Sequence, residues 1–193
     1  MEMKFYRAAL LAVTIFFVGC DEAPKPAQTT TPATVLEGKT MGTFWRVSVV
    51  GVDAKRAAEL QVKIQTQLDA DDQLLSTYKN DSALMRFNLS NSLSPWPVSD
   101  AMADIVTSAL RIGAKTDGAM DITVGPLVNL WGFGPDQQPL HIPTQEQIDA
   151  AKAKTGLSHL KVVNEAHQNY LQKDLPDLYV DLSTVGEGYA ADH

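Results

Sequence analysis

The most informative stretch of the sequence reads Gly118-Ala119-Met120-Asp121-Ile122-Thr123-Val124-Gly125-Pro126-Leu127, and Trp131-Gly132-Phe133-Gly134 follows shortly after it. It combines small residues, which allow close backbone approach, with an acid, a hydroxyl and aromatic rings. One interpretation is a loop that holds a flat ligand. The other is a tight Gly/Pro connection over a tryptophan core, and the residues alone leave both interpretations open.

A second stretch reads Tyr179-Val180-Asp181-Leu182-Ser183-Thr184-Val185-Gly186-Glu187-Gly188-Tyr189. It places an acid and hydroxyls where a predicted strand ends and a helix is expected to begin. Free backbone N–H groups at a helix start favour an anion. Asp181 could equally be a residue that caps this helix. Weaker candidates for a site are Thr40-Met41-Gly42-Thr43 and Leu75-Ser76-Thr77-Tyr78.

Outward from these stretches, the chain mixes the periodicities of helices and strands. Alternation over residues 43–52 predicts a strand, with residues 35–40 as its hairpin partner. Apolar residues three and four apart predict a helix over residues 54–68. The other predicted elements are a helix capped by Ser99 and ended by Gly113 or Gly118, a helix through Lys154 with Thr144 and Gln147 as a capping box, strands at 160–163, 168–172 and 178–182, turns at Asn164-Glu165 and at 174–176, and a helix opening after Ser183.

These elements predict an α+β fold, with a mixed or antiparallel sheet and packed helices. The final predicted helix stops before it could bury a face. We therefore expect the chain to be truncated before the C-terminal part of its fold.

Composition narrows the class of protein. The chain has 193 residues, with 16 Lys and Arg against 23 Asp and Glu, for a net charge of −7. Its hydrophobic share of 45% favours a globular protein over a disordered chain or a polytopic membrane protein. Because the basic residues are few and scattered, we expect no binding to nucleic acid. A single cysteine excludes an intrachain disulfide and a cysteine-based zinc site.

Motifs of the common catalytic and nucleotide-binding sites are missing from the sequence. The four histidines lie far apart, without the spacing of metal ligands. No Gly-x-Ser-x-Gly elbow supports a serine triad, and no Gly-x-x-x-x-Gly-Lys-Ser/Thr loop is present. Gly186-Glu187-Gly188 is only a fragment of a dinucleotide fingerprint.

The N-terminus is typical of a secreted bacterial protein. Lys4 and Arg7 precede an apolar run that is too short for a bilayer span, which takes about 20 residues, but suits a secretory signal. Small residues before Cys20 resemble a lipobox, so we expect a signal peptide over residues 1–19 and lipid on Cys20. The alternative is an ordinary signal peptide with a chance cysteine.

Two features after the signal predict where the protein resides. Asp21 resembles a signal for retention on the inner membrane. Residues 20–34 are rich in proline and threonine, which predicts an extended tether. We therefore expect a domain over residues 35–193 that is lipid-anchored to the inner membrane on its periplasmic side.

Several motifs, taken in order, resemble those of the bacterial FAD:protein FMN transferases, the ApbE-type flavin transferases once called thiamine-biosynthesis lipoproteins. The resemblance covers nearly all of the chain from Val35 onward and is close to the enterobacterial lipoprotein members. The motifs are Thr40-Met41-Gly42-Thr43, Ser76-Thr77-Tyr78 with Asp81-Ser82 and Asn88, residues 118–127 with Trp131-Gly132-Phe133, and Asp181-Leu182-Ser183 with Gly188-Tyr189-Ala190 and Asp192.

The resemblance implies a reaction. FAD would be split at its pyrophosphate with a divalent metal, usually Mg²⁺. The FMN half would be joined through a phosphoester to a Ser or Thr of an acceptor protein, with release of AMP. The implied acceptors are periplasm-facing subunits of membrane redox pumps.

The resemblance also implies roles for particular residues. Met41 and Tyr78 would pack around the flavin, and Asp181 and Glu187 would contact FAD from the last motif. Thr184 would supply a metal ligand. The remaining FAD contacts would come from Gly118, Ala119, Met120 and Asp121.

This chain departs from the family pattern in ways that limit how far the family's residue roles apply to it. Many members have Phe in place of Met120 and Lys in place of Glu187, and an acid cannot do the electrostatic work of a base near a pyrophosphate. The family's downstream half, which completes the metal site, is absent, so we expect weak metal binding and no turnover from these 193 residues alone. The alternatives are a flavin-binding lipoprotein without transferase activity, a hydrolase that converts FAD to FMN and AMP, and a purely structural envelope lipoprotein.

Overall fold

The computed structural model describes residues 32–135 and 142–193. The chain divides into two units, Met1–Pro32 and Ala33–His193, and every helix and strand below belongs to the second. The predicted signal peptide, Cys20 and most of the tether therefore lie outside the described residues. Within the described ranges, no helix has both the length and the apolar character that crossing a membrane requires.

The fold begins with an antiparallel hairpin of β1 (Ala33–Thr40) and β2 (Thr43–Val50), as the alternation predicted. Thr40 pairs with Thr43, so only Met41 and Gly42 form the turn. Both have positive φ, 48° and 76°, as the tightest hairpin turns require. Met41 therefore lies in the turn at the end of the hairpin.

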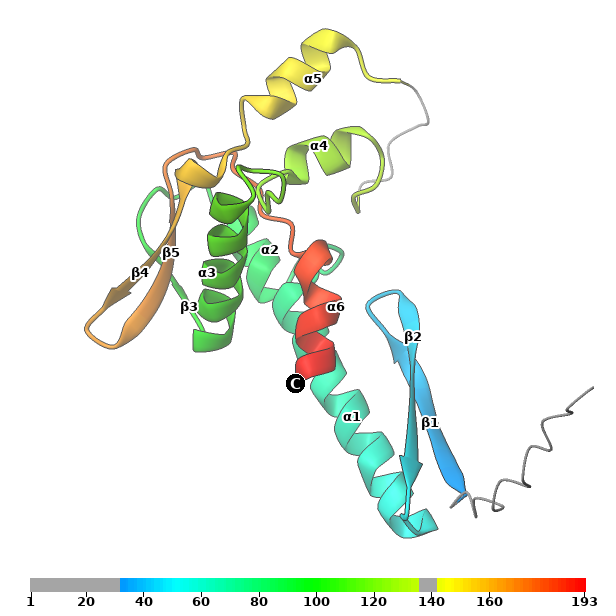
Figure 1. Cartoon of the computed structure of the whole chain (residues 1–193). Helices are drawn as coiled ribbons and strands as arrows, with labels where there is room; N and C mark the ends of the chain where they lie inside the picture. The colour runs from blue at the N-terminus through cyan, green and yellow to red at the C-terminus, as the bar shows by residue number, and fades with distance from the viewer. Residues whose placement is uncertain (1–31, 136–141) are drawn as a thin grey trace, which may run out of the picture. The chain divides into compact units, whose positions relative to one another are not determined.

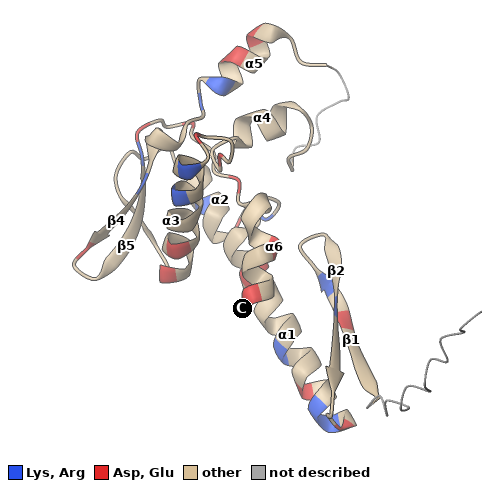
Figure 2. Cartoon of the chain, viewed as in Figure 1, with Lys and Arg blue, Asp and Glu red and all other residues tan. Residues whose placement is uncertain are grey.

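Helix α1 (Ala54–Leu75) lies beside this hairpin (Figure 1). Asp53 caps it by accepting a hydrogen bond from the Arg56 backbone N–H at 2.7 Å. The helix is longer than predicted because its buried face continues past Leu68 through Asp71 to Leu75, and the interruption by a carboxylate hid this continuation in the sequence. Its basic residues lie in its N-terminal half, whereas an acidic run occupies its C-terminal part (Figure 2).

A second, three-stranded antiparallel sheet has the order β3-β5-β4, formed by β3 (Trp96–Val98), β5 (Gln168–Lys173) and β4 (Leu160–Glu165). The predicted turn at Asn164-Glu165 is wrong, because these residues end β4 and pair with Asn169 and Gln168. The turn is Ala166-His167, with φ of 50° and 65°. Neither residue is the glycine or asparagine that favours positive φ, so the sequence carried no signal for it.

Helix α3 (Asp100–Lys115) packs against β4 and β5 (Figure 1). Its predicted cap is confirmed, since Ser99 accepts from the Met102 N–H at 3.3 Å. The Gly118 N–H bonds the Gly113 carbonyl at 2.9 Å and closes the C-terminal end. Helix α5 (Gln145–Lys152) has the predicted capping box of Thr144 and Gln147, and it ends before the predicted Lys154.

Several short elements were not predicted. Helix α2 (Ala83–Asn88) is capped by Ser82, which accepts from the Met85 N–H at 2.9 Å. Helix α4 (Gly125–Leu130) occupies part of the stretch that the sequence suggested was a loop, with Pro126 in its first turn. β3 contains Pro97, which disfavours a strand, and a 3₁₀ turn spans Leu157–His159.

The predicted strand over residues 178–182 is also wrong, since these residues join neither sheet. Their burial still alternates, with Leu178, Val180 and Leu182 fully buried. Helix α6 (Ser183–Asp192) follows directly. The core that these residues share with α2, α3 and the second sheet contains Leu84, Phe87, Met102, Ile105, Val106, Ala109, Ile122, Leu160 and Leu171.

Candidate functional site

A cavity of about 510 Å³ lies where the hairpin turn, the end of α1 and the start of α6 meet. Small-molecule sites are typically clefts of about 300–1,000 Å³. The lining residues come from segments that are far apart in the sequence: Met41, Gly42, Asp72, Leu75, Ser76, Thr77, Tyr78, Lys79, Leu182, Ser183, Gly186 and Glu187. The fold thus brings the first, second and last of the motifs together.

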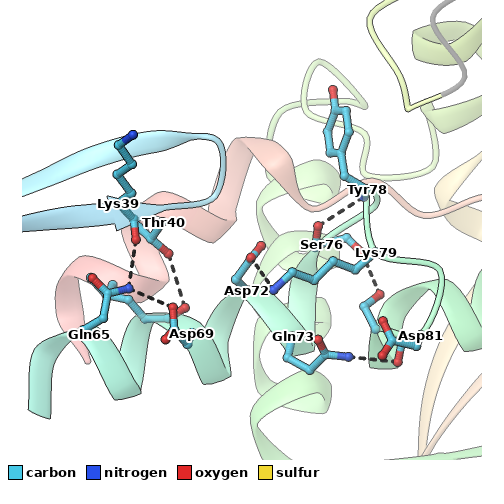
Figure 3. A network of polar contacts seen from close by, with 12 residues as sticks. Lys39, Thr40, Gln65, Asp69, Asp72, Gln73, Ser76, Tyr78, Lys79 and Asp81 are labelled. Atoms are coloured by element: carbon cyan, nitrogen blue, oxygen red, sulfur yellow. Dashed lines mark hydrogen bonds and ion pairs between the residues drawn. The ribbon is translucent and has the colours of Figure 1, made fainter. Parts of the chain in front are cut away.

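The hairpin turn is held at the cavity by polar contacts with α1. Gln65 donates to the Lys39 carbonyl at 2.8 Å, and its own carbonyl accepts from the Trp45 indole N–H at 2.9 Å. Thr40 donates to the Leu68 carbonyl at 3.4 Å. Figure 3 shows Lys39, Thr40 and Gln65 from close by. These contacts place the Met41 thioether among the lining residues.

The end of α1 contributes charge and an aromatic ring. Lys79 forms an ion pair with Asp72 at 2.6 Å, and only 16% of the Asp72 side chain is exposed (Figure 3). The Ser76 hydroxyl accepts from the Tyr78 N–H at 3.1 Å. Tyr78 is 62% exposed, and its hydroxyl donates to the Phe133 carbonyl at 2.9 Å. The ring is therefore available at the cavity rather than part of the core.

The start of α6 forms the remaining wall of the cavity. The Asp181 carboxylate accepts from the Ser183 N–H at 2.8 Å. The N-cap of α6 is Leu182, which makes no side-chain capping bond, so Asp181 precedes the cap and is not itself the capping residue that one of the two sequence interpretations held. Ser183, Gly186 and Glu187 line the cavity, whereas Asp181 and Thr184 do not. The structure therefore brings Met41, Tyr78 and Glu187 together, with Asp181 immediately behind the helix start.

The residues Gly118, Ala119, Met120 and Asp121 lie outside this cavity lining. Asp121 instead closes a local turn, accepting from the Thr123 N–H at 2.7 Å and from the Thr123 hydroxyl at 2.6 Å. The stretch reaches the site indirectly, because the Asp181 N–H donates to the Ile122 carbonyl at 2.7 Å. The idea of a tryptophan core beneath it is wrong, since Trp131 is 46% exposed.

Sequence reasoning did not single out Asp72 and Lys79. Their pairing becomes meaningful only once α1 extends to Leu75 and carries Asp72 to the cavity wall. The one available signal was the acidic run that precedes the Leu75-Ser76-Thr77-Tyr78 motif.

A second cavity, of about 700 Å³, lies between the hairpin, α1 and α6 and shares Met41 and Glu187 with the first. Near it, Asp71 is 2% exposed and accepts from Gln67 at 3.0 Å, while the His193 Nδ1 lies 3.1 Å from the same oxygen. Among the described residues, its other oxygen has no hydrogen-bond partner. Burial raises the pKa of Tyr189, and the carboxylates of Asp71 and Asp104 add to this effect.

The described residues do not by themselves form a metal site. Within residues 32–135 and 142–193, no group of three or more His, Cys, Asp or Glu side chains is placed to hold a cation. Mg²⁺ requires six oxygen ligands in a nearly octahedral arrangement. Thr184 is exposed and the nearby Asp181 carboxylate already accepts from the Ser183 N–H, so this segment offers at most part of such a shell.

Known proteins share both the sequence and the fold. The chain is 80% identical to the FAD:protein FMN transferase of Escherichia coli K12 over 100% of its length, and 79% identical to that of Salmonella typhimurium. The solved structure of the flavin transferase ApbE from Vibrio cholerae matches 83% of the chain, with a TM-score of 0.76 and 42% identity.

The matched proteins are considerably longer than this chain. The chain covers 55% of the Escherichia coli protein and 52% of the Vibrio cholerae structure, about half of each. The family model described as the ApbE family matches residues 41–193, which contain every element from the hairpin turn to α6. The chain therefore belongs to the ApbE family.

Proposed function

We propose that the full-length protein transfers FMN from FAD to a Ser or Thr hydroxyl of an acceptor protein. The observation that carries this proposal is the cavity, which gathers Met41, Tyr78 and Glu187 from distant segments. A thioether and an aromatic ring suit a flat isoalloxazine, and the cavity has the size of a ligand site. The name that the relatives carry, FAD:protein FMN transferase, supports the same reaction.

The chemistry is the attack of an acceptor hydroxyl on phosphorus. An oxygen–phosphorus bond forms to the phosphate of the FMN half, the pyrophosphate bond breaks, and AMP leaves with the bridging oxygen. The hydroxyl proton passes to a base. For this chain's own residues we propose that Met41 and Tyr78 hold the flavin, that Glu187 contacts FAD from the cavity wall, and that the α6 start faces the phosphates. The family resemblance adds contacts from Asp181 and residues 118–121, which we propose to reach FAD from outside the cavity lining.

The reaction is proposed to depend on Mg²⁺. Thr184 would contribute one ligand, and the remaining ligands would come from outside the described residues. The 193-residue chain alone is accordingly expected to bind the metal weakly and to show no turnover. FMN transfer by this chain without further sequence would contradict that expectation.

We further propose that the protein works at the periplasmic face of the inner membrane, anchored by lipid on Cys20. Its acceptors would be periplasm-facing subunits of membrane redox pumps, which a tethered enzyme could reach on the same membrane. Replacement of Cys20 by Ser tests the anchor. The variant is expected to move from the membrane fraction to the soluble fraction, and a variant that stays in the membrane would refute the lipid attachment.

The decisive experiment uses a soluble form of the full-length protein from which the predicted signal peptide and tether, residues 1–34, have been removed. It is incubated with FAD, Mg²⁺ and an acceptor domain that bears a candidate Thr, and the acceptor mass and the nucleotides are then measured. The expected result is a mass gain of one FMN on the acceptor, with AMP released and both lost on addition of EDTA. Free FMN and AMP without acceptor modification would instead indicate a hydrolase, and unchanged bound FAD would indicate a flavin-binding lipoprotein.

A further inference from the structure

The segment that precedes Asp181 is held by side chains instead of by a neighbouring strand. Val180 is fully buried and lies outside both sheets, so its backbone groups need partners that a sheet would normally supply. The side-chain amide of Asn88 supplies a partner for both the N–H and the carbonyl of Val180. Its oxygen accepts from the Val180 N–H at 2.9 Å, and its nitrogen donates to the Val180 carbonyl at 2.8 Å.

Lys173 reinforces this arrangement from β5. Its side chain is buried, with 1% of the residue exposed, although lysine is almost never buried without partners. The ammonium lies 3.4 Å from the Asn88 carbonyl, 3.3 Å from the Leu178 carbonyl and 5.1 Å from the centre of the Phe87 ring. Burial lowers the pKa of Lys173, while Asp177 opposes this shift. One cation therefore joins the end of α2 to the segment before the site.

The held segment leads directly into the candidate site. Asp181 follows Val180, donates to the Ile122 carbonyl through its N–H and accepts from the Ser183 N–H, at the start of α6, through its carboxylate. The next residues, Leu182 and Ser183, line the cavity. A shift of Val180 would therefore move both Asp181 and the start of α6.

We propose that Asn88 and Lys173 are positioning residues that stand in for a neighbouring strand and thereby fix Asp181 and the start of α6 at the flavin site. This inference rests on the proposed function for the identity of the ligand, because the site is taken to bind FAD. Its geometric part, the placement of Val180 and Asp181, does not depend on the ligand.

The test compares Asn88→Ala with Leu160→Ala in the full-length protein. Leu160 is buried at the start of the edge strand β4, lines neither cavity described above and makes a matched control for general destabilisation. Asn88→Ala is expected to weaken FAD binding about tenfold, because buried backbone groups lose their partners. Leu160→Ala is expected to leave the FAD dissociation constant within about twofold while lowering the thermal midpoint comparably. Equal effects of the two variants on FAD binding would overturn the proposal.

A double-mutant cycle with Asp181→Asn tests whether Asn88 acts through Asp181. If it does, the double variant is expected to lose less FAD affinity than the sum of the two single losses, with only the part that Asn88 exerts through the start of α6 left over. Fully additive losses would contradict the proposal. For Lys173, replacement by Met is expected to weaken FAD binding, and replacement by Arg to recover part of the loss by keeping a cation that donates to the two carbonyls.

Amide hydrogen exchange provides a readout that is independent of the ligand. Asn88→Ala is expected to accelerate exchange at Val180, Asp181 and the first turn of α6, and Leu160→Ala is not. If the wild-type protein binds no FAD, the proposed function fails and the exchange measurement alone decides whether Asn88 holds the segment. Unchanged exchange at Val180 in Asn88→Ala would refute the positioning role.

Discussion

The two parts of the described chain that meet near the cavity are stabilised in different ways. The part built from α2, α3 and the β3-β5-β4 sheet has a continuous apolar core, in which Leu171, Leu84 and Val106 are fully buried. The hairpin leaves large apolar residues exposed, with Phe44 at 74% and Val50 at 63%. It is tied to α1 by hydrogen bonds from Gln61 and Gln65.

This difference indicates which wall of the cavity is rigid. Apolar packing stabilises in proportion to the area removed from water, whereas a partly exposed hydrogen bond contributes only about 1 kcal/mol. The wall formed by the start of α6 is backed by the core, through Leu178, Val180 and Leu182. The wall formed by Met41 depends on the hairpin, so we expect it to open at lower free-energy cost.

The largest effect is expected in the core. Leu171 is fully buried on the central strand β5 and pairs with Trp96 and Val162. Leu171→Ala is expected to lower the free energy of unfolding by about 2–5 kcal/mol, because it removes apolar contacts and leaves a cavity. Denaturant unfolding measures this loss, and the exposed Leu89→Ala serves as a control that is expected to change little. A loss below about 1 kcal/mol would contradict the tightly packed core.

A smaller loss is expected where α4 touches the segment before Asp181. A Cβ on Gly125 would lie 2.8 Å from the Tyr179 carbonyl oxygen and against its ring. Gly125→Ala is expected to lower the free energy of unfolding by about 1–3 kcal/mol, because the added methyl group overpacks this contact. The same displacement is expected to weaken flavin binding.

Gly188→Ala in α6 is the matched control for this substitution. A Cβ on Gly188 would meet no atom of the described residues within 4 Å, so the change is expected to stabilise the helix by up to about 1 kcal/mol. Thermal unfolding of the two variants checks the contrast. A neutral Gly125→Ala would show that α4 and Tyr179 can separate easily.

Gln65→Ala is expected to lower the free energy of unfolding by about 1 kcal/mol, because the Gln65 amide bonds both Lys39 and Trp45. The effect should be confined to the hairpin. Hydrogen exchange is expected to accelerate in β1 and β2 but not in β5. Gln145→Ala, which removes a single contact with Asp149 on α5, is the control. Acceleration throughout the core would contradict the separation between the two parts.

The smallest effect is expected for the ion pair at the cavity wall. Lys79 is 40% exposed at its side chain, so its pairing with Asp72 is screened by solvent. Lys79→Met is expected to change the free energy of unfolding by less than about 1 kcal/mol, with the difference disappearing in high salt. Lys63→Met, on the helix that carries Asp72, is the control. A loss that persists in high salt would show that Lys79 contributes through packing.

Local signals predicted much of the fold. The hairpin, the Ser99 cap of α3 and the capping box at Thr144 follow from residue types within a few positions of one another, so single-sequence reasoning reached them. The failures have two causes. The turn at Ala166-His167 lacks the residue types that usually mark such turns, whereas the end of α1 and the unpaired segment 178–182 depend on partners that are distant in the sequence.

For the candidate site, too, the sequence determined some features and the tertiary structure others. The sequence by itself determined which residue types are available, and its motifs singled out Met41, Tyr78, Asp181 and Glu187. Only the tertiary structure decided that Met41, Tyr78 and Glu187 share one cavity, that the Asp181 carboxylate binds the Ser183 N–H, and that residues 118–121 do not line that cavity. The physical reason is that a side chain's chemistry is local, whereas its neighbours depend on how helices and strands bury their apolar faces.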